Sequence, residues 1–364
     1  MTPSRVVLPL EEVLALLKRY ARMVDEAIER YIPREFDEAY VSWACGKPRF
    51  AYDTEALTEA IAKPFWDLLD RGGKRWRPAL MLMVYEALSG RDAEEVLDFA
   101  IIPEVIHNGT LIVDDVEDDS ELRRGKPCVH RIYGLDIAIN TGNTMYYLPL
   151  MVVLRSDKLD ERTKLRIYEM YVQEMVRLSF GQAMDIAWHR GIRGAEVSEE
   201  QYLQMCAYKT GTLARFAAKL GAILAGAPEE QVESMGRFAE AVGVAFQIQD
   251  DILNITGDVA KYGKELGGDI TEGKRTLMVI YTLRHARPED RQRLLEILDM
   301  HTRDPELIAE AISIMERYGA VEYAKDVARR LVREAWAEVD AWLRPSPAKE
   351  ALRALARFLI EREF

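Results

Sequence analysis

Cysteine, histidine and excess positive charge are all scarce in this chain of 364 residues. Its three cysteines, Cys45, Cys128 and Cys206, are widely separated and odd in number, a pattern that favours neither a disulfide framework nor a zinc site. The formal net charge of -12 leaves no basic excess to neutralise a nucleic acid backbone. We therefore expect no nucleic acid partner and a reducing, cytoplasmic environment.

Long apolar runs and a secretory signal are also lacking. No uncharged apolar run reaches the roughly 20 residues that span a bilayer. Residues 1–10 contain no basic region followed by a long apolar stretch, which a signal peptide requires. We therefore expect neither a transmembrane segment nor a signal peptide. Apolar residues still make up 49% of the chain, which is enough for a substantial core.

Apolar residues recur at spacings of three and four along most of the chain, which is the period of amphipathic helices. The first such face runs from Val13 to Ile28 and stops at Pro33, and residues 34–53 form the least regular stretch. Further helices are expected at 54–70, 78–88, 92–119, 134–155, 160–190, 198–226, 228–256, 274–299, 305–318, 320–344 and 347–362. No sustained alternation of period two and no Asn-Gly hairpin signal are present.

The sequence thus predicts an all-α fold. No linker rich in serine, glycine or proline divides the chain, so we expect a single large helical bundle over residues 1–364. Residues 1–53 would form an N-terminal helix and an irregular extension of that domain.

Two acidic segments follow apolar helical runs. In the first, Asp114, Asp115 and Asp118 come directly after Leu111-Ile112-Val113 and share one helix face. Carboxylates this crowded repel one another, and magnesium would remove that cost, because it prefers oxygen ligands. A single acidic run is more often a solvated helix end, but this one lacks opposing lysines one turn away.

The second acidic segment repeats the spacing with Asp250, Asp251 and Asn254. Asparagine keeps an oxygen but no charge, so this site would hold a metal less strongly. Either segment alone could be an ordinary polar helix end, and the argument therefore depends on both occurring in one chain.

Clusters of cations accompany the aspartates. Two glycines precede cations at a helix start, where free backbone N–H groups and the helix dipole favour an anion. The clustered cations are Lys74, Arg75, Arg77, Arg123, Arg124, Lys126, Lys209, Lys261, Lys264, Lys274 and Arg275. Taken singly they are typical of loop charges on an acidic protein. Beside paired carboxylates they indicate a magnesium-dependent enzyme that acts on diphosphates.

His107 lies on the same apolar run, two turns before Asp115. A lone histidine there is usually a satisfied core residue, and its place on the aspartate-bearing helix makes a ligand-binding role equally plausible. No Ser/His/Asp or Cys/His arrangement and no zinc spacing of histidines stands out.

Five segments, in this order, resemble the trans-prenyltransferases, the short-chain isoprenyl diphosphate synthases, and among them geranylgeranyl diphosphate synthases most. They are Gly72-Gly-Lys-Arg-Trp-Arg-Pro78, Asp114-Asp-Val-Glu-Asp-Asp-Ser-Glu-Leu-Arg-Arg-Gly-Lys-Pro127, Gly181-Gln-Ala-Met-Asp185, Lys209-Thr-Gly-Thr-Leu213 and Phe246-Gln-Ile-Gln-Asp-Asp251. The resemblance covers about residues 66–285, and the motifs are highly specific as a set.

The resemblance implies a helical bundle of the isoprenoid synthase type, usually a homodimer, with both aspartate motifs facing across the mouth of a central cavity. Asp114, Asp115 and Asp118 would bind two magnesium ions on the allylic diphosphate, and Asp250 would bind a third. That diphosphate would be held by Arg123, Lys209, Thr210, Gln247, Lys264 and Lys274. Isopentenyl diphosphate would be held by Lys74, Arg77, His107 and Arg124. Gln182 and Asp185 would lie in the same cavity, with Asp185 beside the metals. The metal contact of Asn254 is left open, because the family's second motif often ends in aspartate.

Product length in this family depends on residues one turn before the first motif, where aromatic side chains keep products short. Gly109 and Thr110 are small, which predicts an open cavity and geranylgeranyl diphosphate (C20), with C25 or longer as the alternative. Met145, Tyr146 or Tyr147 would otherwise form the floor. The rival functions are a noncatalytic subunit of a heteromeric prenyl synthase and a terpene cyclase.

Overall fold

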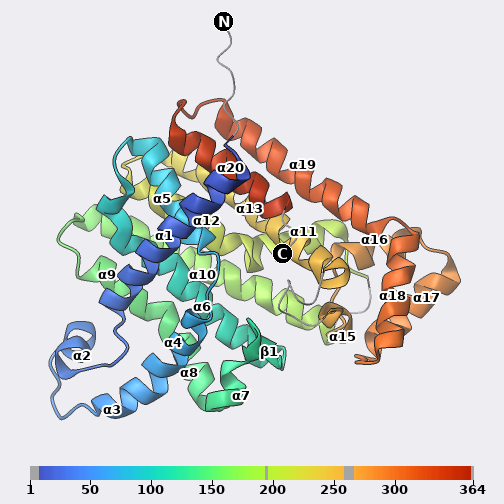
Figure 1. Ribbon diagram of the computed structural model, residues 1–364, viewed down its shortest axis with the longest axis horizontal. Helices are drawn as coiled ribbons and strands as arrows, with labels where there is room; N and C mark the ends of the chain where they lie inside the picture. Colours follow the sequence, from blue (N-terminus) through green and yellow to red (C-terminus); the bar gives the residue numbers. More distant parts are fainter. Residues whose placement is uncertain (1–7, 193–195, 258–265, 362–364) are drawn as a thin grey trace, which may run out of the picture. The chain divides into compact units, whose positions relative to one another are not determined.

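The computed structural model describes residues 8–192, 196–257 and 266–361. Regular structure within them is almost wholly helical (Figure 1), so the predicted all-α class is confirmed. The chain divides into two compact units. The N-terminal unit consists of Pro9–Tyr168 and Leu220–Ala227, and the C-terminal unit mainly of Glu169–Lys219 and Pro228–Phe364. The single domain expected from the sequence stays a prediction, since each unit is described by itself.

The N-terminal unit contains most of the short elements. Its elements are α1 Leu10–Tyr31, α2 Glu38–Cys45, α3 Thr54–Leu57, the π-helix Thr58–Ala62, α4 Lys63–Asp70, α5 Trp76–Ser89, a 3-10 turn Ala93–Val96, α6 Leu97–Glu117, β1 Leu122–Arg123, β2 Lys126–Pro127, α7 Val129–Tyr133, α8 Leu135–Tyr147, a 3-10 turn Leu148–Leu150, α9 Met151–Leu154 and the first residues of α10 Glu161–His189.

The core of this unit is built around α5 and α6. Every residue of α5 from Trp76 to Tyr85 is buried, and α6 packs against α1, α5 and α8. A helix that is apolar on all sides belongs in the interior of a protein. The segment Ala93–Glu117 is the one described helix long and apolar enough to cross a membrane, but 67% of its apolar window is buried inside the protein. Packing thus accounts for its composition.

The structure corrects the sequence-based boundaries of the N-terminal unit at three places. The helix expected at 134–155 is divided into α8 and α9 by the 3-10 turn Leu148–Leu150, which contains Pro149. The stretch 34–53 contains α2, whose first turn is capped by the Asp37 side chain, which accepts a hydrogen bond from the backbone N–H of Tyr40. A short antiparallel hairpin pairs β1 with β2. Its two turn residues, Arg124 and Gly125, have φ angles of 51° and 74°. Positive φ at both positions is typical of a tight hairpin turn, and glycine was its only sequence signal.

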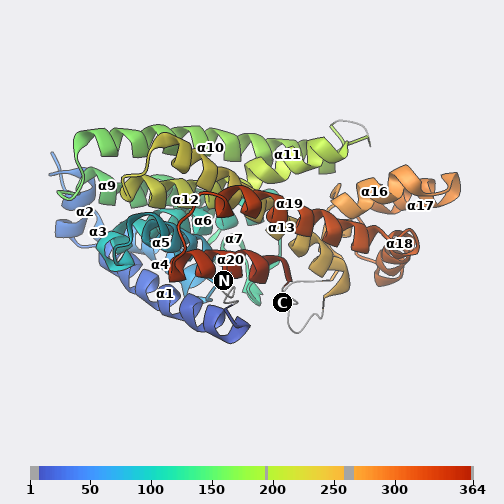
Figure 2. The same ribbon diagram turned by 90° about the horizontal axis from the view of Figure 1, so that it is seen from above.

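The C-terminal unit is a layer of long helices with a group of shorter ones. Beyond the remainder of α10 its elements are α11 Glu199–Lys209, α12 Gly211–Leu224, which ends in the other unit, α13 Glu229–Thr256, α15 Gly268–Thr271, α16 Leu277–His285, α17 Pro288–Asp299, α18 Pro305–Arg317, α19 Ala320–Asp340 and α20 Pro347–Glu361. The helix α19 packs lengthwise on α13, and α20 covers both. Figure 2 shows α16, α17 and α18 grouped together.

Two helices expected in this unit are each divided. The stretch 198–226 breaks at Thr210, which ends α11. The stretch 274–299 breaks at Ala286 and Arg287, which are extended with ψ angles of 153°. Arg287 precedes Pro288, and a residue before proline is disfavoured in the helical region. Pro288 therefore begins α17 instead of continuing α16.

Candidate functional site

Arg75 anchors the cation-rich segment at the start of α5. Its φ angle of 49° is left-handed, which is uncommon for a residue other than glycine. The guanidinium donates to Asp25 at 2.8 Å and to Glu104 at 3.2 Å. It also donates to the backbone oxygens of Leu69 at 2.9 Å and Gly72 at 3.0 Å. Arg75 therefore joins α1, α4 and α6, and two carboxylates balance its charge.

Gly73 lies between two arginines. Its φ angle is 145°, and a Cβ atom there would come within 2.5 Å of Arg75 Nη1 and 3.2 Å of Arg124 Nη2. A side chain would thus displace the guanidinium groups, so glycine is required for close approach as well as for backbone conformation. This contact explains the second glycine of the sequence motif.

The charges of nearby guanidinium groups act on His107. Burial lowers the pKa of His107 well below its ordinary value, and the charges of Arg77 and Arg124 lower it further. Burial also lowers the pKa of Arg77 and of Arg124 to about 10, while the Glu104 carboxylate opposes that shift. The imidazole is therefore neutral at pH 7, and the arginines keep their charge in an interior where an anion would be strongly attracted.

The first aspartate motif ends α6. Asp115 is 1% exposed, and Arg123 Nε donates to its Oδ1 at 3.0 Å and to its Oδ2 at 3.2 Å. A second Arg123 nitrogen lies 3.8 Å from Asp114. Burial alone would lower the pKa of Arg123, but the charge of Asp115 outweighs it and raises that pKa. The hairpin thus places Arg123 in contact with the aspartates that precede it in the sequence.

A metal site confined to protein ligands is not formed here. No group of three His, Cys, Asp or Glu side chains surrounds a common point among the residues that the structure describes. Asp114 and Asp118 are both half-buried. Magnesium usually takes one or two carboxylates and completes its shell with waters and substrate phosphates. The motif, with Arg123 behind it, fits magnesium shared with a diphosphate and does not fit a closed cage.

In the C-terminal unit, Lys209 is placed by a glycine on another helix. A Cβ on Gly181 of α10 would lie 2.3 Å from the backbone nitrogen of Lys209, so the end of α11 touches α10 at this point. One turn further along α10, Asp185 accepts a hydrogen bond from Lys209 Nζ at 2.6 Å. Gly181 therefore makes room for the backbone of Lys209, and Asp185, four residues later, binds the side chain of the same lysine.

A chain of hydrogen bonds connects the break at Thr210 with the second aspartate pair. Thr210 Oγ1 donates to Gln247 Oε1 at 2.7 Å, and Gln247 Nε2 donates to Asp251 Oδ1 at 2.8 Å. The hydroxyl of Tyr202 donates to Asp251 Oδ2 at 2.6 Å. Burial raises the pKa of Asp251 to about 6, and these two donors oppose that shift. Both oxygens of Asp251 thus have protein partners.

Asn254, the third member of the second motif, is 4% exposed. Its Oδ1 accepts from the backbone N–H of Asp269 at 3.1 Å, and its backbone oxygen accepts from Gly267 N at 2.8 Å. These bonds tie α13 to the start of α15. The amide oxygen therefore has a structural use, which explains why asparagine can stand where the resemblance expects aspartate.

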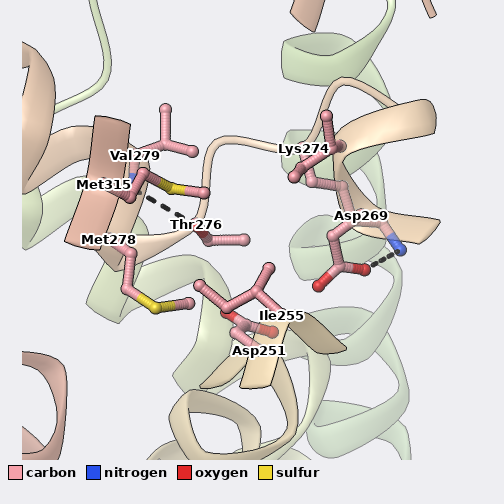
Figure 3. A pocket seen from close by; sticks show the side chains of 9 residues that line it. Asp251, Ile255, Asp269, Lys274, Thr276, Met278, Val279 and Met315 are labelled. Atoms are coloured by element: carbon pink, nitrogen blue, oxygen red, sulfur yellow. Dashed lines mark hydrogen bonds and ion pairs between the residues drawn. The ribbon is translucent and has the colours of Figure 1, made fainter. Parts of the chain in front are cut away.

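A small pocket lies beside Asp251 (Figure 3). Asp251, Asp269 and Lys274 form its polar side, and its apolar side includes Ile255 and Met315. Lys274 Nζ lies 2.5 Å from Glu272 and 3.8 Å from Asp269, so its charge is balanced by acids of α15 and its C-cap. Lys264, expected to join it on the diphosphate, lies outside the described residues.

The residue pair expected to open the product cavity is only partly accessible. A Cβ on Gly109 would lie 2.7 Å from the Met145 Cβ and 2.8 Å from the Gly142 oxygen. Gly109 therefore allows α6 and α8 to approach each other, and the open space expected beside it is absent. Thr110 is half-buried and donates to the His107 oxygen at 2.7 Å.

The structure thus gathers the expected residues into two sets. In the N-terminal unit Arg77 and Arg124 lie around His107, Lys74 is half-buried directly before Arg75, and Arg123 pairs with the first motif. In the C-terminal unit Lys209, Thr210 and Gln247 lead to the second motif. Whether the two sets meet at one cavity stays a prediction.

Three buried residues behind these sets were missed from the sequence. Glu104 accepts a hydrogen bond from Arg75, Asn108 accepts one from Arg124, and Tyr202 donates one to Asp251. The only available signal was a lone acid, Glu104, one turn before Asn108 on an otherwise apolar helix.

Comparisons with known proteins place these residues in context. The polyprenyl synthetase family model matches residues 58–315. A short chain isoprenyl diphosphate synthase of Methanothermobacter thermautotrophicus is 36% identical over 352 residues, which cover 97% of this chain and 99% of the relative. The solved geranylgeranyl pyrophosphate synthetase from Pyrococcus horikoshii is 32% identical with a TM-score of 0.82, over 97% of this chain and 99% of that one. The geranylgeranyl pyrophosphate synthase from Corynebacterium glutamicum, solved with isoprenyl diphosphate and magnesium, is 26% identical with a TM-score of 0.78, over 98% of this chain and 100% of that one.

Proposed function

This chain belongs to the polyprenyl synthetase family and is a trans-prenyltransferase that joins isopentenyl diphosphate to an allylic diphosphate, and we propose that its main product is geranylgeranyl diphosphate. The observation that carries the site assignment is the close approach of Arg75 and Arg124 at Gly73, with charges that act on His107. A cluster of guanidinium groups favours a multivalent anion, and diphosphate is the anion that the family's substrates share.

The two substrates would use different sets of residues. Isopentenyl diphosphate would be held by Lys74, Arg77, His107 and Arg124. The allylic diphosphate would be held by Arg123, Lys209, Thr210 and Gln247, together with Lys264 and Lys274. The contacts of the two arginines support this division. Arg123 forms ion pairs with the carboxylates of the first motif, whereas Arg124 donates a hydrogen bond to Asn108 of α6.

Magnesium would be held by Asp114, Asp115, Asp118 and Asp250, up to three ions in all. When bound, it would stabilise the negative charge on the departing diphosphate. Arg123 would hold that diphosphate while its bond to the allylic carbon breaks, because its guanidinium already faces the motif at 3.0 Å from Asp115. Arg123 and Asp115 would thus hold the diphosphate and the metal side by side.

The orienting residues have a separate task. The double bond of isopentenyl diphosphate attacks the allylic carbon, and the proton lost from isopentenyl diphosphate passes to the departing diphosphate. Arg77 and Arg124 would fix the nucleophile by its own diphosphate, which makes the encounter of the two carbons effectively intramolecular. Apolar walls such as α5 and α6 would exclude water, which would otherwise quench the cation.

Product length is proposed from Thr110. Its short side chain is half-buried one turn before Asp114, where a larger residue would limit chain growth. Gly109 contributes differently from the sequence-based expectation, because its role is the contact with α8.

We also propose a cytoplasmic homodimer. Along α10 the side chains of Val172, Val176 and Phe180 are 59%, 44% and 62% exposed and recur every four residues, so they form one apolar stripe. An exposed stripe of this kind fits burial against a second copy.

The product of the purified protein tests the proposed chain length. Farnesyl diphosphate, labelled isopentenyl diphosphate and magnesium should give a C20 product by mass analysis. A product that stops at C15 would refute it, and C25 or longer products would identify a longer-chain synthase. A cyclic hydrocarbon would identify a terpene cyclase, and no turnover a noncatalytic subunit.

A further inference from the structure

A buried carboxylate and a buried amide lie behind the arginines of the N-terminal unit. Glu104 is 2% exposed and Asn108 is 0% exposed, and they are one turn apart on α6. Burying polar side chains this deeply costs free energy unless their groups are hydrogen-bonded. Neither residue is among those proposed to touch a substrate, so their contacts must reveal their role.

The contacts of Asn108 fix the orientation of its amide. Nδ2 donates to the backbone oxygen and to Oε1 of Glu104, both at 2.9 Å. Oδ1 accepts from Arg124 Nη1 at 3.3 Å. The opposite orientation would place an NH2 group against the guanidinium and an oxygen against the carboxylate, which are two repulsive contacts. The amide therefore has one orientation, and it presents an acceptor to Arg124.

Glu104 is fixed from the other side. Its Oε1 accepts from Arg75 Nη1 at 3.2 Å, and Arg75 is itself held by Asp25 at 2.8 Å. A continuous chain of hydrogen bonds thus runs from Arg75 through Glu104 and Asn108 to Arg124. Gly73 lies next to both ends of this chain, since a Cβ atom there would be 2.5 Å from Arg75 Nη1 and 3.2 Å from Arg124 Nη2.

Charge supports the same role. The carboxylate of Glu104 opposes the loss of charge that burial imposes on Arg77 and Arg124. Because Glu104 is 2% exposed, it can act on these guanidinium groups from behind without competing for their exposed side. A carboxylate at the mouth of the same pocket would instead repel an incoming diphosphate.

We propose that Asn108 and Glu104 are positioning residues for isopentenyl diphosphate: Asn108 aims the guanidinium of Arg124, and Glu104 orients Asn108. This inference rests on the proposed function, which assigns Arg124 to that substrate. The two residues act through the arginine and do not contact the diphosphate.

The first test is Asn108→Leu, which removes donor and acceptor with little change of volume. The KM for isopentenyl diphosphate should rise about tenfold or more, as for a lost hydrogen bond to a charged group, while the KM for the allylic diphosphate stays nearly constant. Thr141→Val is the matched control, because Thr141 is also 0% exposed in this unit and its hydroxyl donates to the Ala60 oxygen at 2.8 Å. It should lower stability without separating the two KM values.

A charge exchange provides the second test and does not depend on the fold of Asn108→Leu. Asn108→Asp keeps an acceptor for Arg124 but sets a carboxylate against Glu104. Adding Glu104→Gln restores a donor to that carboxylate and the original net charge. The double variant should therefore have a KM for isopentenyl diphosphate closer to wild type than Asn108→Asp alone.

Several results would overturn the inference: an unchanged KM in Asn108→Leu, an equal rise for both substrates, or additive effects in the double variant. A wild-type protein that fails to extend any allylic diphosphate would instead refute the proposed function. Calorimetric binding of inorganic diphosphate would then decide the positioning role. Asn108→Leu should bind it about tenfold more weakly, and equal binding would overturn the inference.

Discussion

Gly181→Ala should separate α10 from the end of α11. The added Cβ would lie 2.3 Å from the Lys209 nitrogen and 2.7 Å from the carbonyl carbon of Tyr208, where ordinary contacts begin at 3.4 Å. The two helices must therefore move apart by about 1 Å, because backbone atoms cannot rotate away as a flexible side chain can. That shift would displace Lys209, whose Nζ lies 2.6 Å from Asp185.

The loss of stability in Gly181→Ala is compared with that of a matched glycine variant, Gly236→Ala. Gly236 of α13 is also inside a helix, but its Cβ would meet only side-chain carbons of Lys219 at 3.0 Å and Arg215 at 3.3 Å. Alanine gains about 1 kcal/mol of helix propensity at either position. Overpacking costs about 1–3 kcal/mol, so Gly181→Ala should be less stable than Gly236→Ala by about that amount.

Urea unfolding followed by circular dichroism measures the stability difference. Kinetics should show a higher KM for the allylic diphosphate in Gly181→Ala, since Lys209 is assigned to that substrate, and an almost unchanged KM for isopentenyl diphosphate. If Gly181→Ala proves as stable and as active as Gly236→Ala, the contact between α10 and α11 does not position Lys209.

Two further predictions concern His107 and Asn254. Because the folded-state pKa of His107 is lowered, the unfolded chain binds its proton first as the pH falls below about 6.5, so the native state loses stability there. His107→Gln should therefore show a shallower loss of stability in urea between about pH 7 and 5, by at most ~1.4 kcal/mol per pH unit, and parallel curves would contradict the neutral imidazole. Asn254→Ala should destabilise by about 1–3 kcal/mol, because the backbone N–H of Asp269 loses its acceptor. Thr256→Ala, which loses a bond to the Ile252 oxygen on the same helix, should cost less, and equal losses would refute this role of Asn254.

The helices and the motifs were readable from the sequence because their signals are local. Apolar periodicity predicts α1 and α6, and Pro33 and Gly90 mark helix ends through their own backbone preferences. At the break after Thr210 the local signal is Gly211, whose Cα would lie 2.7 Å from a Cβ on Gly243. That contact between helices is not readable from the sequence.

The partners of the site residues were not readable for the same reason. Glu104 resembles a stray acid on an apolar helix until Arg75, 29 residues away, is found bonded to it. The partner of Asp251 is likewise not visible in the sequence, because Tyr202, which donates to its carboxylate, is 49 residues away. Periodicity predicts which face of a helix is buried, but it does not predict which distant side chain lies there.

The rate at which labelled isopentenyl diphosphate enters an allylic diphosphate tests the central claim most directly. Wild-type protein with magnesium should extend the allylic substrate. Asp114→Ala and Lys74→Ala should lower the rate by about 10²-fold or more while the unfolding midpoint is kept. Arg91→Ala, which removes an exposed ion pair with Glu95, should leave the rate unchanged. Near-normal extension by Asp114→Ala would contradict the account.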